Sequence, residues 1–223
     1  EEPDITIIIN LVEQQITLQR KSLYIFGRYR KFVRTIPQTK WPCTSCRGKG
    51  CKRCNFTGKL YQESVEEIIA QPIMQKTGGT GSRFHGAGRE DIDALMLGNG
   101  RPFVLEILQP KRREINLQKL EKAINKFGRK KVEVDQLAFS DKKMVQKLKE
   151  FSTKTRKTYR AKIKLETAVT DEQVRLLEEQ LREAKIKQRT PQRVLHRRAN
   201  LERIRRVVEL KVTRTKSTEL EAD

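Results

Sequence analysis

The sequence predicts an α+β protein with a mixed, largely antiparallel sheet flanked by helices. Three observations support this prediction. Strand-like and helix-like segments follow one another without the regular β-α-β order of parallel sheets. No run of about 18 apolar residues is present to form a membrane-spanning helix. Four cysteines are grouped in one short segment, which adds a small metal-binding knuckle to the main fold.

The N-terminal segment, residues 4–34, predicts two or three strands. It is rich in β-branched residues and alternates between apolar and polar side chains. The basic stretch FGRYRK at residues 26–31 is expected to be a polar turn between strands. The cysteine segment follows at residues 41–58.

A helix, a loop and a strand are predicted next. Ser64 lies three residues before Glu67, as in a capping box, so a helix should begin there. Pro72 should interrupt this helix, because proline lacks the backbone donor that a helix needs. Residues 76–90 contain five glycines and predict a loop, and the apolar residues 101–108 predict a strand.

The second half of the chain mixes helices and strands. Residues 116–128 have the pattern of an amphipathic helix that Gly128 closes. Residues 170–185 are expected to form a helix whose acidic first turn suits the helix dipole. The remaining predicted elements are a helix at 141–152 and strands at 130–140, 157–169, 188–198 and 201–215.

The charge of the chain predicts a polyanionic partner. Lys and Arg number 49 against 28 Asp and Glu, which gives a net charge of +21. Such a field attracts nucleic acid or anionic lipid but says nothing about the fold. Lipid is the weaker candidate because the sequence has neither a membrane span nor an N-terminal signal pattern. We therefore expect nucleic acid as the partner and no membrane, and nothing in the sequence indicates an obligate protein partner.

The four cysteines form two Cys-x-x-Cys pairs separated by four residues. They are Cys43, Cys46, Cys51 and Cys54. Four thiolates satisfy a tetrahedral Zn²⁺ and leave no open position, so the predicted site is structural. Gly48 and Gly50 permit the tight reversal between the pairs. The clustering favours a metal over disulfides, and hence a reduced, cytoplasmic compartment.

Other interpretations of this segment remain open. An iron–sulfur cluster or a redox dithiol would use the same thiols. The neighbouring cations Arg47, Lys49, Lys52 and Arg53 either lower the thiol pKa values and contact phosphate, or are solvated tips of the knuckle. Residues 43–50 also spell the CxxCxGxG pattern of chaperone zinc domains, but that pattern normally occurs in repeats.

An acidic run, Glu90, Asp91 and Asp93, is unusual in so basic a chain. Neighbouring positive charge keeps an aspartate ionised. A positioned carboxylate on a surface that attracts phosphate repels that ligand, so it does not fit a role in binding alone. From the residues, Asp91 is either one partner of an Asp–Arg ion pair that fixes the loop, or a functional group.

Four stretches resemble one known family in order and spacing. They are GRYRKFVRTIPQTKWPC, GREDIDALMLGNGRPFVLEI, KTRKTYRAKIKL and RTPQRVLHRRANLERIR. The sequence is similar to the archaeal and eukaryotic transfer-RNA pseudouridine synthases of the Pus-ten family. This resemblance implies a pseudouridine-synthase core. It also implies three regions: the tail of an N-terminal RNA-binding domain at 1–40, the metal knuckle at 41–60, and the catalytic domain at 61–223.

The resemblance implies roles for two residues. In such synthases an Arg-x-Asp motif carries the essential aspartate, and Arg89-Glu90-Asp91 matches it. Asp91 would attack the flipped uridine or stabilise its cleaved glycosidic bond. Asp93 is the alternative, with the wrong spacing from Arg89. Tyr159, in KTYRAKI, takes the position of the tyrosine that stacks on the target base, whereas a tyrosine in a strand is otherwise more often part of the core.

The family's third motif supplies a basic side chain after a Gly-Thr-Tyr sequence, and it does not occur in these residues. We expect the sequence to be an excerpt whose catalytic domain is incomplete at its C-terminus. The implied activity is the isomerisation of uridine to pseudouridine in the TΨC arm of tRNA, with structural Zn²⁺ and no organic cofactor. The alternative is a non-catalytic, zinc-containing RNA-binding protein.

Basic side chains near these motifs are the candidates for RNA contact. The window of residues 185–198 holds six Lys and Arg and no acid, and we expect it to face RNA. The predicted RNA-binding residues are Arg28, Arg30, Arg89, Arg101, Arg189, Arg193, Arg197 and Arg198.

Overall fold

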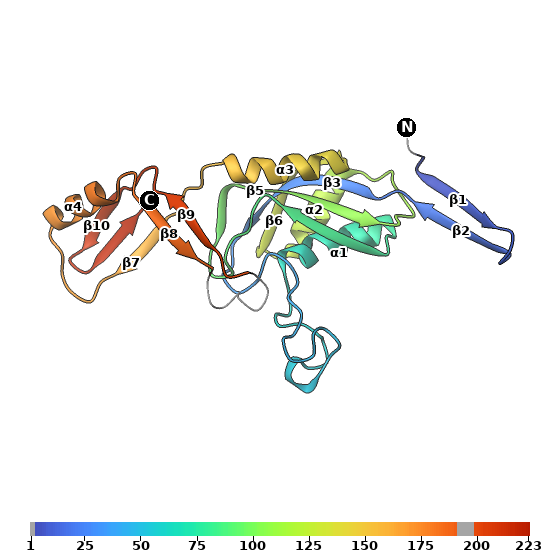
Figure 1. Ribbon diagram of the computed structural model, residues 1–223, viewed down its shortest axis with the longest axis horizontal. Coiled ribbons are helices and arrows are strands. Elements are labelled where there is room, and N and C mark those ends of the chain that lie inside the picture. Colours follow the sequence, from blue (N-terminus) through green and yellow to red (C-terminus); the bar gives the residue numbers. More distant parts are fainter. Residues whose placement is uncertain (1–2, 191–198) are drawn as a thin grey trace. The chain divides into compact units, whose positions relative to one another are not determined.

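The computed structural model describes residues 3–190 and 199–223, and the chain divides into two compact units, Glu1–Thr155 and Arg156–Asp223. Every strand pairing among the described residues is antiparallel, and helices accompany the sheets in both units (Figure 1). The predicted α+β class with a largely antiparallel sheet is confirmed.

The first unit is built on a four-stranded sheet with the strand order β4-β5-β3-β6. A separate hairpin, β1–β2, precedes it. The strands are β1 (Ile5–Asn10), β2 (Gln15–Arg20), β3 (Leu23–Lys31), β4 (Gly81–Gly86), β5 (Met96–Leu108) and β6 (Val132–Ser140). The helices are the 3₁₀ turn η1 (Lys52–Cys54), α1 (Val65–Thr77), α2 (Leu117–Gly128) and α3 (Lys142–Lys154).

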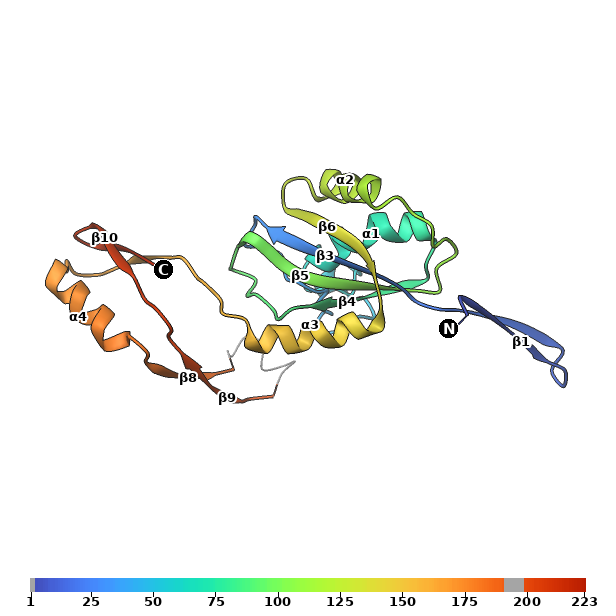
Figure 2. The ribbon, with the colours of Figure 1, turned by 90° about the horizontal axis from the view of Figure 1, so that it is seen from above.

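Helices cover both faces of this sheet (Figure 2). Helices α1 and α2 pack on one face, where the fully buried Ile25 and Phe103 lie in the same cluster as Ile69 of α1. Helix α3 packs on the other face, where Val104 of β5 contacts the cluster around Val145. Consecutive side chains on β5, such as Phe103 and Val104, therefore point to opposite faces of the sheet and enter two different cores, as the two-residue period of a strand requires.

Residues 26–31 form part of the central strand β3, so the predicted turn at FGRYRK was wrong. Strand β3 pairs with β5 on one side and β6 on the other, and its residues alternate between buried and half-buried. A Cβ atom at Gly27 would lie 2.6 Å from the side chain of Leu137, so any larger residue there would force that side chain to move. The basic residues mimic a polar turn in sequence, yet Lys31 is fully buried.

Two other local predictions were wrong because tertiary packing outweighed local preference. Helix α1 continues through Pro72 to Thr77, with Ile69 and Ile73 fully buried on either side of the proline. It begins as predicted, since Ser64 accepts a hydrogen bond from the backbone of Glu67. The glycine-rich stretch predicted as a loop contains strand β4, which pairs with β5 along its whole length.

The second unit contains one helix, a three-stranded sheet and a hairpin within its described residues. Its elements are β7 (Ala161–Lys164), α4 (Asp171–Leu181), β8 (Lys185–Arg189), β9 (Glu202–Arg206), β10 (Val212–Lys216) and β11 (Glu219–Ala222). The sheet order is β10-β11-β7, and β8 pairs with β9. Val174 of α4 packs on Val212 and Leu220.

Strand β7 is shorter than predicted, and β11 was missed. The first compact unit ends at Thr155. Strand β3, which lies within the predicted N-terminal region 1–40, belongs to the four-stranded sheet of this first unit. The predicted domain limits at residues 40 and 60 stay predictions. Across the described ranges, no helix has the length and apolar character needed to cross a membrane.

Candidate active site and metal centre

Asp91 lies at the surface, in the loop between β4 and β5. Its side chain is exposed. Its Oδ1 accepts a 2.7 Å hydrogen bond from the backbone N–H of Ile92. Its carbonyl oxygen accepts a 3.1 Å hydrogen bond from the N–H of Ala94, which closes a turn. The carboxylate is therefore accessible, and one of its oxygens is oriented by the backbone of its own loop.

Lys31, the last residue of β3, holds the backbone of this loop. Its Nζ donates to the carbonyl oxygens of Asp91 and Ile92, both at 3.2 Å. It also donates to the carbonyl oxygen of Ile36 at 3.1 Å. An ammonium group has three donors, so all of them are used in these contacts. The central strand of the sheet thus fixes the position of the backbone that carries Asp91.

Glu90, the residue before Asp91, forms a buried ion pair with Arg101 of β5. The Nε of Arg101 lies 3.0 Å from the Oε2 of Glu90, and the two side chains are 9% and 2% exposed. Nη1 of Arg101 donates to the carbonyl oxygen of Ala87 at 2.7 Å. The buried guanidinium of Arg101 is committed to the loop, which weakens the prediction that Arg101 contacts RNA.

Tyr29 and Gln38 complete the buried network under the loop. The hydroxyl of Tyr29 donates to the Oε2 of Glu90 at 2.7 Å. Nε2 of Gln38 donates to the hydroxyl of Tyr29 at 2.8 Å and to the carbonyl oxygen of Gly88 at 3.0 Å. The other carboxylate oxygen of Glu90 is buried and has no hydrogen-bond partner among the described residues. The contacts of Glu90 are thus concentrated on one oxygen.

Burial shifts the pKa of two groups in this network. The pKa of Lys31 is lowered because burial disfavours the charged form, while the carboxylates of Glu90 and Asp93 act against this shift. The pKa of Tyr29 is raised well above 10.0 by burial and by the negative charge of Glu90. Tyr29 therefore stays protonated and remains a hydrogen-bond donor at neutral pH.

This supporting network was not predicted from the sequence. The signal was present in the alternation of residues 23–31, which places Tyr29 and Lys31 on the same side of the strand as Ile25. Polar side chains at buried positions of a strand require partners. Those partners come from distant parts of the chain, so the residue pattern alone did not identify them.

Two predicted RNA contacts on β3 have partners within the protein. Arg28 donates from Nη2 to the carbonyl oxygen of Gly100 at 3.0 Å. Arg30 forms an ion pair with Asp135, with 3.1 Å between Nη2 and Oδ2. Both side chains are held along the sheet, which weakens the prediction that they contact RNA. Arg30 would have to leave its acidic partner to reach a phosphate.

The other predicted RNA-binding residues are either exposed or outside the described residues. Arg89 is exposed beside Asp91, and Nη2 donates to Thr39 at 3.1 Å. Arg189, in the second unit, has an 82% exposed side chain that lies 3.7 Å from Glu202. Three others, in the stretch 191–198, lie outside the described residues, and they are Arg193, Arg197 and Arg198.

Tyr159 is exposed, which excludes a core role. It lies just before β7 and not within a strand, and its exposed fraction is 69%. A tyrosine with this much exposed ring surface is available for contact with a ligand.

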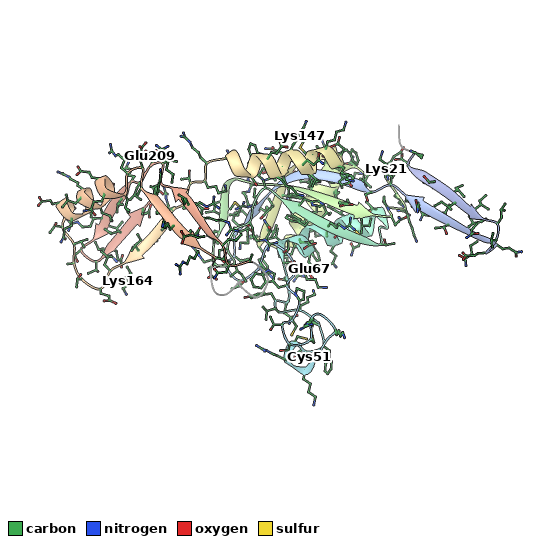
Figure 3. The ribbon with its side chains drawn as sticks, in the orientation of Figure 1. Lys21, Cys51, Glu67, Lys147, Lys164 and Glu209 are labelled. Atoms are coloured by element: carbon green, nitrogen blue, oxygen red, sulfur yellow. The ribbon has the colours of Figure 1, made fainter. Side chains whose placement is uncertain are left out.

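The four cysteines converge in the loop between β3 and α1, where Figure 3 labels Cys51. Their sulfur atoms all lie within 4.8 Å of one another. The sulfur of Cys51 lies 3.9 Å from that of Cys43 and 3.7 Å from that of Cys54. Four thiolates about 2.3 Å from a tetrahedral zinc ion are about 3.8 Å apart. The donor set therefore fits such an ion.

The local contacts favour the thiolate form of Cys54 but not that of Cys51. Burial opposes ionisation of Cys54, but the N–H groups of Cys51 and Gly58 donate to its Sγ and lower the pKa of the thiol to about 6. At Cys51 a backbone donor lowers the pKa, but burial and the neighbouring sulfur atoms outweigh it and raise the pKa to about 11. Gly48 and Gly50 have φ values of 95°, which confirms the predicted reversal.

A second group of polar side chains lies elsewhere on the four-stranded sheet. Glu106 of β5 contacts His85 at 3.1 Å and Arg83 at 3.3 Å. It also accepts a 3.2 Å hydrogen bond from Ser22. Together these partners provide the carboxylate of Glu106 with hydrogen bonds and opposite charge, as expected for a paired acid on an apolar strand.

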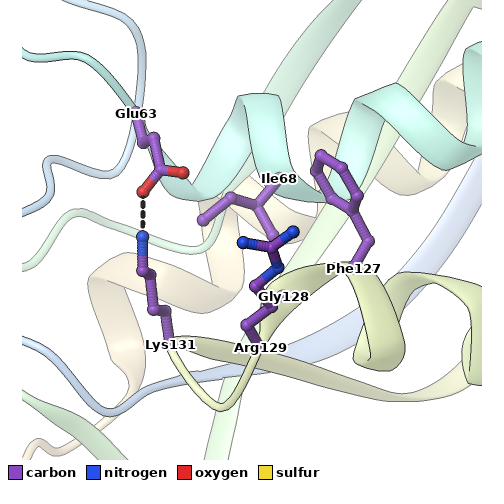
Figure 4. Close-up of a pocket in the computed structure, with 6 residues that line it drawn as sticks. All are labelled: Glu63, Ile68, Phe127, Gly128, Arg129 and Lys131. Atoms are coloured by element: carbon purple, nitrogen blue, oxygen red, sulfur yellow. Dashed lines mark hydrogen bonds and ion pairs between the residues drawn. The ribbon is translucent and has the colours of Figure 1, made fainter.

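A hollow between α1 and the end of α2 is shown in Figure 4. It is lined by Glu63, Ile68, Phe127, Gly128, Arg129 and Lys131. Its acid, Glu63, forms an ion pair with Lys131, and Asp91 is not among its lining residues. The carboxylate in this hollow is therefore engaged by a neighbouring cation, and the hollow is separate from the Asp91 loop.

Comparison with known proteins matches the chain to one family. The family model described as "Pus10, C-terminal" matches residues 24–223. The tRNA pseudouridine synthase Pus10 of Methanocaldococcus jannaschii is 54% identical over 99% of this chain and 48% of its own length. The proteins of the same name from Methanothermobacter marburgensis and Archaeoglobus fulgidus are 53% and 47% identical, over 90% and 94% of this chain and 49% and 57% of theirs.

The chain spans about half the length of the curated relatives it matches. The family model covers the four-stranded sheet from Tyr24 onward, the cysteine cluster, the Asp91 loop and the second unit. The chain therefore belongs to the Pus10, C-terminal family.

Proposed function

We propose that the chain is the catalytic part of a tRNA pseudouridine synthase and that Asp91 is its essential carboxylate. The curated relatives are named for this activity. The observation that carries the proposal is the contrast between an exposed Asp91 and a buried support for its backbone. Lys31 and the Glu90–Arg101 pair rigidly position a loop whose surface residue is an acid. Catalytic groups are typically placed in this way, on a backbone fixed by buried neighbours.

The proposed reaction is an isomerisation of uridine in the TΨC arm. The bond from C1′ to N1 breaks and a bond from C1′ to C5 forms. C5 loses a proton and N1 gains one, so the atoms balance without an oxidant, reductant or organic cofactor. Asp91 either attacks the uridine or stabilises the cleaved glycosidic bond. The target nucleotide must leave its stack, which costs a few kcal/mol, and phosphate contacts offset that cost.

Other residues have supporting roles in this proposal. Tyr159 stacks on the target base and helps to remove its proton, for which its exposed ring is suited. Arg89, exposed next to the Asp91 loop, and Arg189 contact phosphates. We retain Arg193, Arg197 and Arg198 as RNA contacts from the sequence, and Arg28 and Arg30 as weaker ones.

The four cysteines bind one structural zinc ion in this proposal. Four thiolates complete the tetrahedron and leave no position for substrate, so the ion would supply folding energy to the segment and not catalysis. Free thiols that are not in disulfides agree with a reduced compartment, and we propose the cytoplasm.

Modification mapping on unmodified tRNA tests the proposal. The complete protein is incubated with a pool of tRNA transcripts, and each new pseudouridine is located. We expect modification confined to the TΨC arm, and none with Asp91→Asn. Tight RNA binding by a wild-type protein that forms no pseudouridine would instead support the non-catalytic, zinc-containing RNA-binding protein.

A further inference from the structure

Four cations and an aromatic ring surround the cysteine cluster and form a surface that we call the knuckle tip. Its residues are Arg47, Lys49, Lys52, Arg53 and Phe56, all of them exposed. Between residues 40 and 59 the chain contains six Lys and Arg and no acid. A divalent ion with four thiolates carries a charge of about −2, which reduces this positive charge without cancelling it.

Phe56 is the unusual member of the knuckle tip. Its side chain is 73% exposed, and its backbone has a φ of 59°. A bulky residue other than glycine rarely adopts this left-handed conformation, and the strain costs about 1–3 kcal/mol. Burial of the ring does not compensate for this cost in the structure. The strained backbone instead presents an aromatic ring to the exterior.

The cysteine loop maintains this conformation. The N–H of Phe56 donates to the carbonyl oxygen of Cys51 at 2.9 Å. Gly50 lies against the same segment, where a Cβ atom would be 2.8 Å from the carbonyl oxygen of Phe56. The metal-binding loop therefore both orders the segment and directs the ring outward.

The cations of the knuckle tip have no acidic partner among the described residues. Arg53 donates to the hydroxyl of Ser45 at 2.9 Å, which leaves most of its donors available. The nearest ion pair along the chain joins Lys59 to Glu67 and lies outside the tip. Four unpaired cations on one short loop repel one another, and an anionic ligand relieves that repulsion.

An exposed ring among arginines and lysines fits single-stranded RNA. Bases unstacked in loops stack on aromatic side chains, and cations contact the adjacent phosphates. A lipid surface would require a larger apolar area than one ring. We propose that the knuckle tip binds an unpaired segment of the tRNA, with Phe56 stacked on a base and the cations on phosphates. This inference rests on the proposed function for the identity of the RNA.

Equilibrium binding of unmodified tRNA to the complete, zinc-loaded protein tests the inference. One variant is Phe56→Leu, which removes the ring and keeps an apolar side chain. Another is the double variant Arg47→Gln and Lys52→Gln. The matched control, Lys142→Gln with Lys143→Gln on α3, removes the same charge from exposed positions outside the knuckle.

We expect Phe56→Leu to weaken binding at least about fivefold without changing its salt dependence, because stacking is not ionic. The double variant should weaken binding about tenfold and reduce the slope of log affinity against log salt by about one to two. Both should retain the zinc content of the wild type, since none of these side chains ligates the ion. The control should lose markedly less affinity.

Unchanged affinity in the two knuckle variants would overturn the inference, as would an equal loss in the control, which would show that only net charge matters. Binding to phosphatidylserine vesicles that Phe56→Leu abolishes, with tRNA affinity unchanged, would assign the tip to lipid instead. Pseudouridine formation by the wild type is measured in parallel. Its absence would refute the proposed function, whereas normal formation with unaltered variant affinity would refute only the knuckle inference.

Discussion

Glu90 and Arg101 form an ion pair beneath the loop that carries Asp91, with 3.0 Å between Oε2 and Nε and both side chains almost fully buried. Glu90 is adjacent to Asp91 in sequence, but its side chain is buried whereas that of Asp91 is exposed. Two neighbouring acids therefore have separate tasks. One anchors the loop in the sheet, and the other is presented at the surface.

Glu90→Gln should destabilise the protein by about 3 kcal/mol or more, because it leaves the guanidinium of Arg101 buried without its counter-charge. Chemical denaturation measures this effect. The double variant Glu90→Gln with Arg101→Met should be more stable than the sum of the two single changes implies. If the loss of unfolding free energy in the double variant equals the sum of the losses in the two single variants, Glu90 and Arg101 are not coupled.

Lys31→Met removes the ammonium that binds the carbonyl oxygens of Asp91 and Ile92. We expect a loss of about 2–4 kcal/mol in the free energy of unfolding, since the freed carbonyls lose a charged donor. Hydrogen exchange of residues 87–95 should accelerate more than that of the strands. The exposed Lys76→Met is the control, and an equal effect there would contradict the proposed role of Lys31.

The raised pKa of Tyr29 predicts how the stability of the protein changes at alkaline pH. Its pKa in the folded protein is raised above 10.0, so its contribution is complete below pH 10 and is lost as the pH rises through the folded value. The wild type should lose stability more steeply above pH 10 than Tyr29→Phe, which has no proton to release. Lys31 titrates in both proteins, so the difference reports Tyr29. Parallel curves would contradict this assignment.

Metal removal should act locally. We expect one zinc ion per chain by elemental analysis, and none in Cys51→Ser. A strong chelator should increase hydrogen exchange within residues 41–60 and leave β3 and β5 protected, because the main core lies in the four-stranded sheet. Ser45→Ala is the matched control, since Ser45 is not a ligand. Iron in place of zinc would retain the site but change its chemistry.

The parts of the fold that depend on local chemistry could be predicted from the sequence. The capping of α1 by Ser64 follows from the spacing to Glu67, and the convergence of the cysteines follows from the spacing of their pairs. The exposed position of Asp91 agrees with a functional acid, although its catalytic role stays a prediction.

The parts that depend on distant partners could not be predicted. FGRYRK has the composition of a turn, and only its pairing with both β5 and β6 makes it the central strand. Lys31 is stable when buried because a loop 60 residues away supplies carbonyl acceptors. Pro72 is accommodated within the helix because Ile69 before it and Ile73 after it are both buried in the main core. In each case non-local contacts outweighed a correct local tendency.

The sharpest test of whether Asp91 is the essential carboxylate compares the activities of Asp91→Asn and Asp93→Asn on a uridine-containing tRNA. Single-turnover rates and tRNA affinities are measured on the complete protein. We expect Asp91→Asn to slow pseudouridine formation by more than about a thousandfold while tRNA affinity is retained, and Asp93→Asn to keep most of the rate. Normal modification by Asp91→Asn would show that this carboxylate is only structural.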